Sequence, residues 1–131
     1  MDDLDYLRAR IPAYADYADE DTRHLVDKQV RAYVGEALSL LQERLGTIAD
    51  PLGGRLEAVL MMCEFTNQKL VIAMDHAHLS DGEVELLHQV DHQLVSIADG
   101  AGGVDHHGLE DYLAEIETLF ARRVKAVFAP V

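Results

Sequence analysis

Residues 79–103 read LSDGEVELLHQVDHQLVSIADGAGG, and this stretch contains a complete helix with its start and its stop. Ser80 and Glu83 have the spacing of a capping box, in which the serine oxygen accepts a backbone amide and the glutamate reaches back to the serine amide. Apolar residues then recur at helical spacing until the glycine-rich stretch 100–103 breaks the pattern. The sequence therefore predicts a helix over about 81–99.

Three further stretches show the same helical period. The first, 20–45, is followed by Gly46, a typical helix stop. The second, 51–78, begins at Asp50 and Pro51, an N-cap and first-turn pair. The third, 106–128, follows Asp105, a possible cap. Residues 1–18 have apolar groups but no sustained period. We therefore expect an all-α protein, an antiparallel, up-down four-helix bundle with an irregular N-terminal arm.

Composition limits the class of protein. The chain of 131 residues is long enough to form one helical-bundle domain with its own core. It has no apolar run long enough to span a membrane, and its acidic start lacks the features of a signal peptide, so we expect a cytoplasmic, bacterial-type protein. A formal net charge of −13 disfavours binding to nucleic acid. The densest basic group, Arg122, Arg123 and Lys125, falls near the end of a helix, where cations suit the dipole.

The predicted helix 51–78 is apolar on two sides. Its second stripe contains Met61, Phe65 and Ile72, roughly opposite the stripe expected to face the core. Exposed apolar patches usually mark partners. Two covers for this stripe are open: the N-terminal arm, folding Ile11, Tyr14 and Tyr17 across it, or a second copy of the chain in a homo-oligomer.

The arm and the helix after it carry a resemblance. The chain has an Ile-Pro-x-Tyr-x-x-Tyr segment followed by a charged helix: Ile11, Pro12, Tyr14 and Tyr17, then Arg23, Asp27, Lys28 and Arg31. Over roughly residues 10–45 this resembles the opening of a group of uncharacterised bacterial helical proteins, although Ala13 and Asp16 stand where glycines often occur. The resemblance implies a helical bundle and no established activity. Alternatively, the charges at 23, 27 and 31 are ion pairs along one helix flank.

Six of the seven histidines fall between residues 76 and 107. His88 and His92 are four apart, the spacing with which one helix face binds a metal. Glu85, three before His88, gives the Glu-x-x-His pair of di-iron bundles, but those proteins need two such pairs and further inward glutamates. We expect these imidazoles to lie on solvated helix surface or exposed loop, except His88 at the edge of the interior. We expect no metal and no cofactor, with His88 and His92 as the nearest metal candidates.

One polar residue of the 81–99 helix, Asp91, points inward among apolar neighbours. Counting along an antiparallel bundle places other polar groups near its level: Tyr33, Asn67, His88 and Tyr112. Hydroxyl and amide donors suit a buried carboxylate. The layer has three interpretations: a structural layer that fixes register, a pocket for a small polar ligand, or a catalytic layer with Asp91 as base.

Motifs for phosphate binding and for nucleophilic catalysis are missing from the sequence. We therefore expect a non-enzymatic, acidic helical bundle that acts through protein contacts or self-association. The alternative is a bundle that binds a small ligand or a metal, possibly an enzyme, centred on Asp91.

Overall fold

The computed structural model describes residues 2–65, 70 and 79–128. Within these residues it contains five α-helices, one short 3₁₀ helix and no strand. The helices are α1 (Asp3–Arg10), α2 (Arg23–Leu45), α3 (Leu52–Glu64), α5 (Asp81–Asp99) and α6 (Leu109–Phe128), and the 3₁₀ helix η1 is Ala101–Gly103. The prediction of an all-α protein is confirmed. Among the same residues, no helix is long and apolar enough to cross a membrane.

Local sequence explains where the helices begin and end. Ser80 and Glu83 form both hydrogen bonds of the predicted capping box at the start of α5, each with 3.2 Å between nitrogen and oxygen. Gly46 follows α2 with φ at 69°, a backbone conformation that residues with a Cβ rarely adopt. At the start of α6, Asp105 Oδ1 accepts a hydrogen bond from Gly108 N at 2.9 Å, and the helix begins one residue later.

Two elements differ from the expected ones. The arm is not wholly irregular, because Asp2 caps the helix α1 by accepting a hydrogen bond from Asp5 N at 2.8 Å. The helix expected over 51–78 ends at Glu64, where Phe65 has an extended backbone. A carbonyl of its last turn, that of Cys63, accepts a hydrogen bond from Arg31 at 2.9 Å. Residues 66–69 and 71–78 lie outside the described part of the chain.

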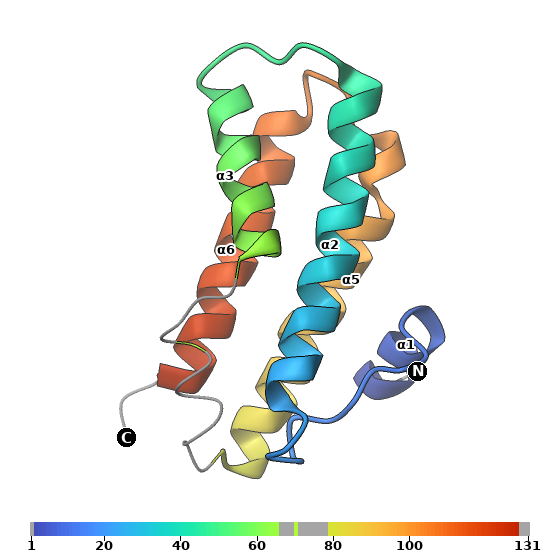
Figure 1. The fold of residues 1–131 in the computed structure, drawn as a ribbon, viewed down its shortest axis with the longest axis vertical. Helices are drawn as coiled ribbons and strands as arrows, with labels where there is room; N and C mark the ends of the chain where they lie inside the picture. The colour runs from blue at the N-terminus through green and yellow to red at the C-terminus, as the bar shows by residue number, and fades with distance from the viewer. Residues whose placement is uncertain (1, 66–69, 71–78, 129–131) are drawn as a thin grey trace.

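The four longer helices pack against one another in a closed cycle: α2 contacts α3 and α5, and α6 contacts α5 and α3. The α2–α3 and α5–α6 connections lie at the same end of the molecule (Figure 1). There Arg44 donates to the carbonyls of Ala101 and Val104 at 2.9 and 2.6 Å. These contacts are compatible with the predicted up-down bundle.

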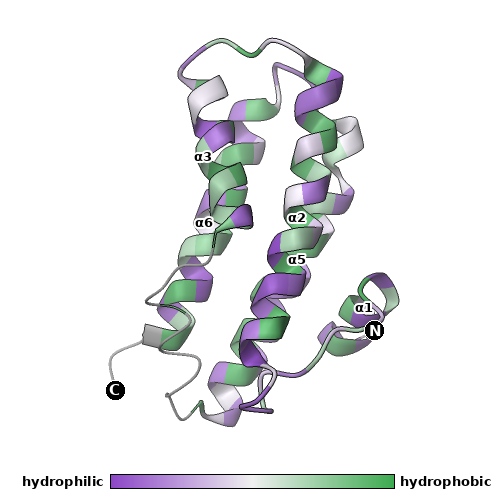
Figure 2. Ribbon diagram, in the orientation of Figure 1, coloured by the Kyte–Doolittle hydropathy of each residue, from purple (hydrophilic) through white to green (hydrophobic). Residues whose placement is uncertain are grey.

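Each long helix carries both hydrophobic and hydrophilic residues (Figure 2). The apolar residues that are buried recur three or four apart, as in Val26, Val30 and Val34 of α2. The short α1 lies to one side and packs on α5, with Leu7 fully buried (Figure 1). The arm therefore packs on α5, and not across the second apolar stripe of α3.

Candidate functional site

Asp91 is fully buried, as its place on the apolar face of the 81–99 helix predicted. Its Oδ1 accepts a hydrogen bond from Arg123 Nε at 2.8 Å. Its Oδ2 accepts one from the Tyr14 hydroxyl at 3.0 Å and a short one from the Tyr17 hydroxyl. Three donors from the described residues thus meet this carboxylate, two of them supplied by the arm.

Arg123 joins this carboxylate to a second one. Its Nη1 donates to Asp27 Oδ1 and its Nη2 to the Tyr17 hydroxyl, at 2.8 and 2.9 Å. Asp27 Oδ2 in turn accepts from Arg31 Nε at 2.9 Å. We call these six residues the buried network: Tyr14, Tyr17, Asp27, Arg31, Asp91 and Arg123. It connects the arm, α2, α5 and α6, and reaches α3 through the carbonyl of Cys63.

The helical period explains why these charges are buried. Arg123 comes three residues after Phe120, seven after Ile116 and four before Val127, all of which are buried. Asp27 is adjacent to Val26 and three residues before Val30 on the inward face of α2. Burying charges is costly unless they are paired and hydrogen-bonded, and here two carboxylates meet two guanidiniums.

Burial also sets the direction of the pKa shifts in the network. It raises the pKa of Asp91, against the attraction of Arg123 and the hydrogen bonds from Tyr17 and Tyr14. Burial alone would lower the pKa of Arg123, but Asp91, Tyr17 and Asp27 hold it above its ordinary value. For Tyr14 and Tyr17, burial is the largest cause of a raised pKa. Both hydroxyls therefore stay protonated and act as donors to Asp91.

The two other tyrosines predicted for the Asp91 layer, Tyr33 and Tyr112, bind other groups. The Tyr33 hydroxyl donates to Asp99. That of Tyr112 donates to the carbonyl of Ile97 at 2.8 Å. Asn67 lies outside the described residues. His88 does reach the edge of the network. It is buried, and its ring contacts that of Tyr17 in a tilted arrangement, with 5.7 Å between the ring centroids.

The sequence interpretation missed five of the six network residues. Counting levels along the helices compared only helix with helix, so an arm that inserts two tyrosines beside Asp91 was not considered. The sequence places Arg123 only in a basic group near the end of a helix, although the apolar period of α6 runs through it. For Asp27 and Arg31 it offers only ion pairs along one flank of a helix. The available signal was the coincidence of both charged positions with the apolar faces of their helices.

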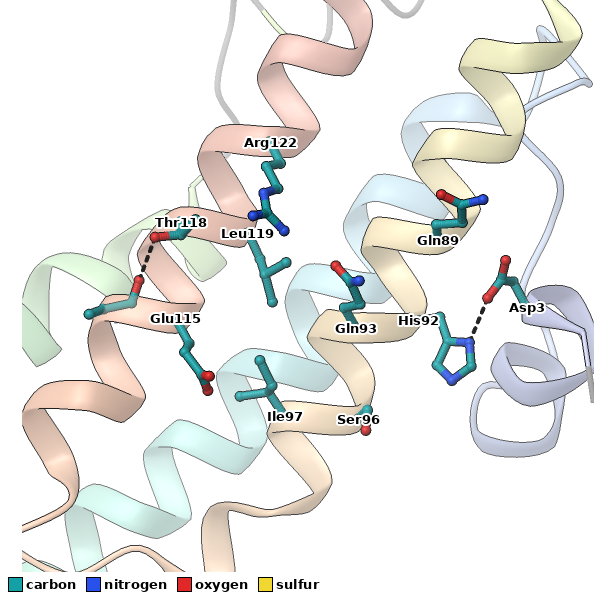
Figure 3. A pocket seen from close by; sticks show the side chains of 11 residues that line it. Asp3, Gln89, His92, Gln93, Ser96, Ile97, Glu115, Thr118, Leu119 and Arg122 are labelled. Atoms are coloured by element: carbon teal, nitrogen blue, oxygen red, sulfur yellow. Dashed lines mark hydrogen bonds and ion pairs between the residues drawn. The ribbon is translucent and has the colours of Figure 1, made fainter.

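The histidines with metal-ligand spacing contact two different carboxylates of the arm. His92 Nδ1 lies 2.6 Å from Asp3 Oδ1 (Figure 3). The His92 ring also stacks on Tyr6. His88 Nε2 lies 3.1 Å from Asp16 Oδ1, at an angle that does not make a hydrogen bond. Among residues 2–65, 70 and 79–128, no group of three or more potential metal ligands comes together.

An open groove of about 730 Å³ runs between α5 and α6, and no residue of the buried network lines it (Figure 3). Gln93, Glu115 and Arg122 project into it, and Ile97 and Leu119 supply apolar surface. Most of the polar residues that line it are exposed positions of α5 and α6, and half-buried His92 and Asp3 of α1 close one side. The groove is therefore the solvated outer surface of the α5–α6 pair.

Asp99 anchors the arm at the end of α5. It accepts hydrogen bonds from Arg10 at 2.6 Å, from Tyr6 at 3.2 Å and from Tyr33. Burial raises the pKa of Asp99, but these hydrogen bonds outweigh it and hold the pKa below the ordinary 3.8. A carboxyl whose pKa is lowered by folding contributes stability above its unfolded pKa, and that stability is lost as the pH falls through the folded pKa.

We therefore expect α1 to loosen in acid. As the pH falls from about 3.8 through the lower pKa of folded Asp99, the carboxyl becomes protonated and loses its ion pair with Arg10, and amide hydrogen exchange in α1 should rise before exchange in α5. Asp99→Asn should produce the same few-fold increase at neutral pH. Asp105→Asn is the matched control, because the pKa of Asp105 is also lowered, first by the Gly108 amide, but at the start of α6. Equal exchange of α1 in the wild type and in Asp99→Asn would contradict this prediction.

Comparison of the chain with protein-family models, with curated proteins and with solved structures gives no match.

Proposed function

We propose that this protein is a non-enzymatic helical bundle that acts through protein contacts, in the first place with a second copy of itself. The observation that carries the proposal is the exposed apolar surface of α3 and its C-terminal cap. The exposed fraction is 57% for Met61, 43% for Met62 and 60% for Phe65. Contiguous apolar groups of this kind favour association, because contact with a partner removes them from water.

The position of the arm supports this proposal. The arm is one of the two covers expected for the second stripe. It packs on α5 instead, with Tyr14 and Tyr17 buried in the core. Met61 and Phe65 are thus left for another molecule. Ile72, the third residue predicted for this interface, lies outside the described residues.

For the buried network we propose a structural role. Asp91 accepts hydrogen bonds from Arg123, Tyr14 and Tyr17, and a buried layer of this kind fixes which helices meet and in which register. The proposal takes as its scaffold the antiparallel, up-down four-helix bundle, in a cytoplasmic protein. The alternative is a ligand- or metal-binding bundle centred on Asp91, a carboxylate that is fully buried and already accepts three hydrogen bonds.

Light scattering tests the association. The wild type at micromolar concentration should have the molar mass of a dimer or larger oligomer, and Phe65→Asp should reduce it to that of the monomer. Leu40→Asp is the matched control, since Leu40 is exposed to a similar extent, 61%, but lies on α2. A monomeric wild type, or an oligomer that tolerates Phe65→Asp, would refute self-association through this surface.

A further inference from the structure

A cavity of about 340 Å³ lies beneath the exposed residues of α3. Its apolar lining comes mainly from α3 and α6: Ala58, Met61, Met62, Phe65, Leu70, Phe120 and Val124. Its polar lining is Asp27, Arg31 and Arg123, one side of the buried network. Ligand sites in proteins typically have about this size, with a mostly apolar wall and a few polar groups that orient the ligand.

Arg123 has hydrogen-bonding capacity left on this side. A guanidinium has five N–H donors. Three of them are used, by Asp91, Asp27 and Tyr17. Each Nη of Arg123 therefore keeps one N–H that has no acceptor among the residues that the structure describes. For a side chain that is only 1% exposed, an unused donor is costly, and an acceptor inside the cavity would satisfy it.

The charge of the lining indicates the kind of acceptor. Two guanidiniums and one carboxylate face the cavity, and the second carboxylate of the network, Asp91, pairs with Arg123 from outside the lining. A carboxylate binds a guanidinium through charge-assisted hydrogen bonds, which are stronger than those of a neutral acceptor. The methionines on the wall are flexible and polarisable, so they adapt to an aliphatic chain.

We propose that this cavity binds a small amphiphile, an aliphatic chain with a carboxylate head that contacts Arg123. The site goes beyond self-association, because it assigns the hollow beneath Met61 and Phe65 to a small molecule whether or not a second chain covers its mouth. It is also distinct from a ligand site at Asp91, because Asp91 does not line the cavity and its hydrogen bonds stay intact when a ligand binds there.

Titration calorimetry with decanoate, below the concentration at which it forms micelles and in about 0.15 M salt, tests the site. Decanoate should bind saturably. 1-Decanol, with the same chain and a neutral head, should bind at least about tenfold more weakly, and decyltrimethylammonium should bind more weakly still. Absence of saturable binding would overturn the proposal, and equal binding of decanol would overturn the carboxylate head.

Two variants locate the ligand. Ala58→Trp fills the cavity from an exposed position and should lower the affinity for decanoate at least tenfold, whereas Ala121→Trp, on an exposed position of α6 outside the lining, should not. Met62→Glu places a like charge on the wall and should weaken decanoate but not decyltrimethylammonium. Circular dichroism checks that each variant is folded. Unchanged binding in both cavity variants would place decanoate elsewhere and refute the site.

Light scattering on the same samples separates this proposal from self-association. Decanoate binding by a protein that proves monomeric would support the cavity and refute the oligomer. An oligomer that binds no decanoate would do the reverse, because a second chain is then the occupant of this face.

Discussion

Arg123→Ala is expected to destabilise the protein by about 3–5 kcal/mol, the cost typical of removing one partner from a buried ion pair. Arg123 is 1% exposed and bridges Asp91 and Asp27. Its loss leaves Asp27 with Arg31 as a partner and leaves the buried carboxylate of Asp91 without a guanidinium. Against a typical total of about 5–15 kcal/mol, the variant should be marginally folded at best. Urea denaturation monitored by circular dichroism measures the difference.

The neighbouring residue supplies the control. Arg122→Ala removes the same side chain from an exposed position of the same helix turn and should change stability by no more than about 0.5 kcal/mol. A second comparison tests whether uncompensated charge is the cause. In an Arg123→Met background, adding Asp91→Asn should restore about 1–3 kcal/mol, because Asp27 keeps Arg31 as its partner and only Asp91 is left without a cation. Equal stability of the two alanine variants, or no recovery in the double variant, would show that the network is not held by its charges.

The helix starts and stops were accessible from sequence because they depend on neighbouring residues. Ser80 and Glu83 are three apart, and their two hydrogen bonds need nothing else in the chain. Gly46 ends α2 by its own backbone freedom. In the same way, the inward orientation of Asp91 follows from the period of its own helix. What one element dictates by itself could thus be predicted.

The partners of Asp91 could not be predicted in the same way, because they depend on how separate elements come together. Tyr14 and Tyr17 are 77 and 74 residues away along the chain and belong to a segment without regular period. The sequence around Arg123, a basic group near a helix end, gives no sign that this residue is buried, since charged residues are rarely buried unless they are paired. The burial of Arg123 follows only when Asp27 and Asp91 are taken together, because two inward carboxylates need a buried cation between them. The surface of α3 was visible from sequence only as an excess of apolar residues, and its cover depends on where the arm packs.

Tyr17→Ala should cost about 3–5 kcal/mol, as for other large aromatic side chains in a core. The residue is fully buried, and its hydroxyl contacts both Asp91 and Arg123. Tyr17→Phe keeps the ring and removes only these hydrogen bonds, so we expect a loss of about 1–3 kcal/mol. Tyr33→Phe is the control, because its hydroxyl also donates to a carboxylate, Asp99, but at a partly exposed site, where the loss should stay below about 1 kcal/mol. Urea denaturation of the three variants gives the comparison.

The contrast between Tyr17→Phe and Tyr33→Phe decides whether the arm is an appendage or a part of the core. If the arm were held only by surface contacts such as those of Asp99, the two variants would lose equal amounts of stability. A larger loss for Tyr17→Phe means that the carboxylate of Asp91 depends on a donor from outside the four longer helices. The buried charges of α2, α5 and α6 are then satisfied only when the arm is in place. Since the same network forms the polar lining of the cavity beneath α3, release of the arm would alter that lining as well.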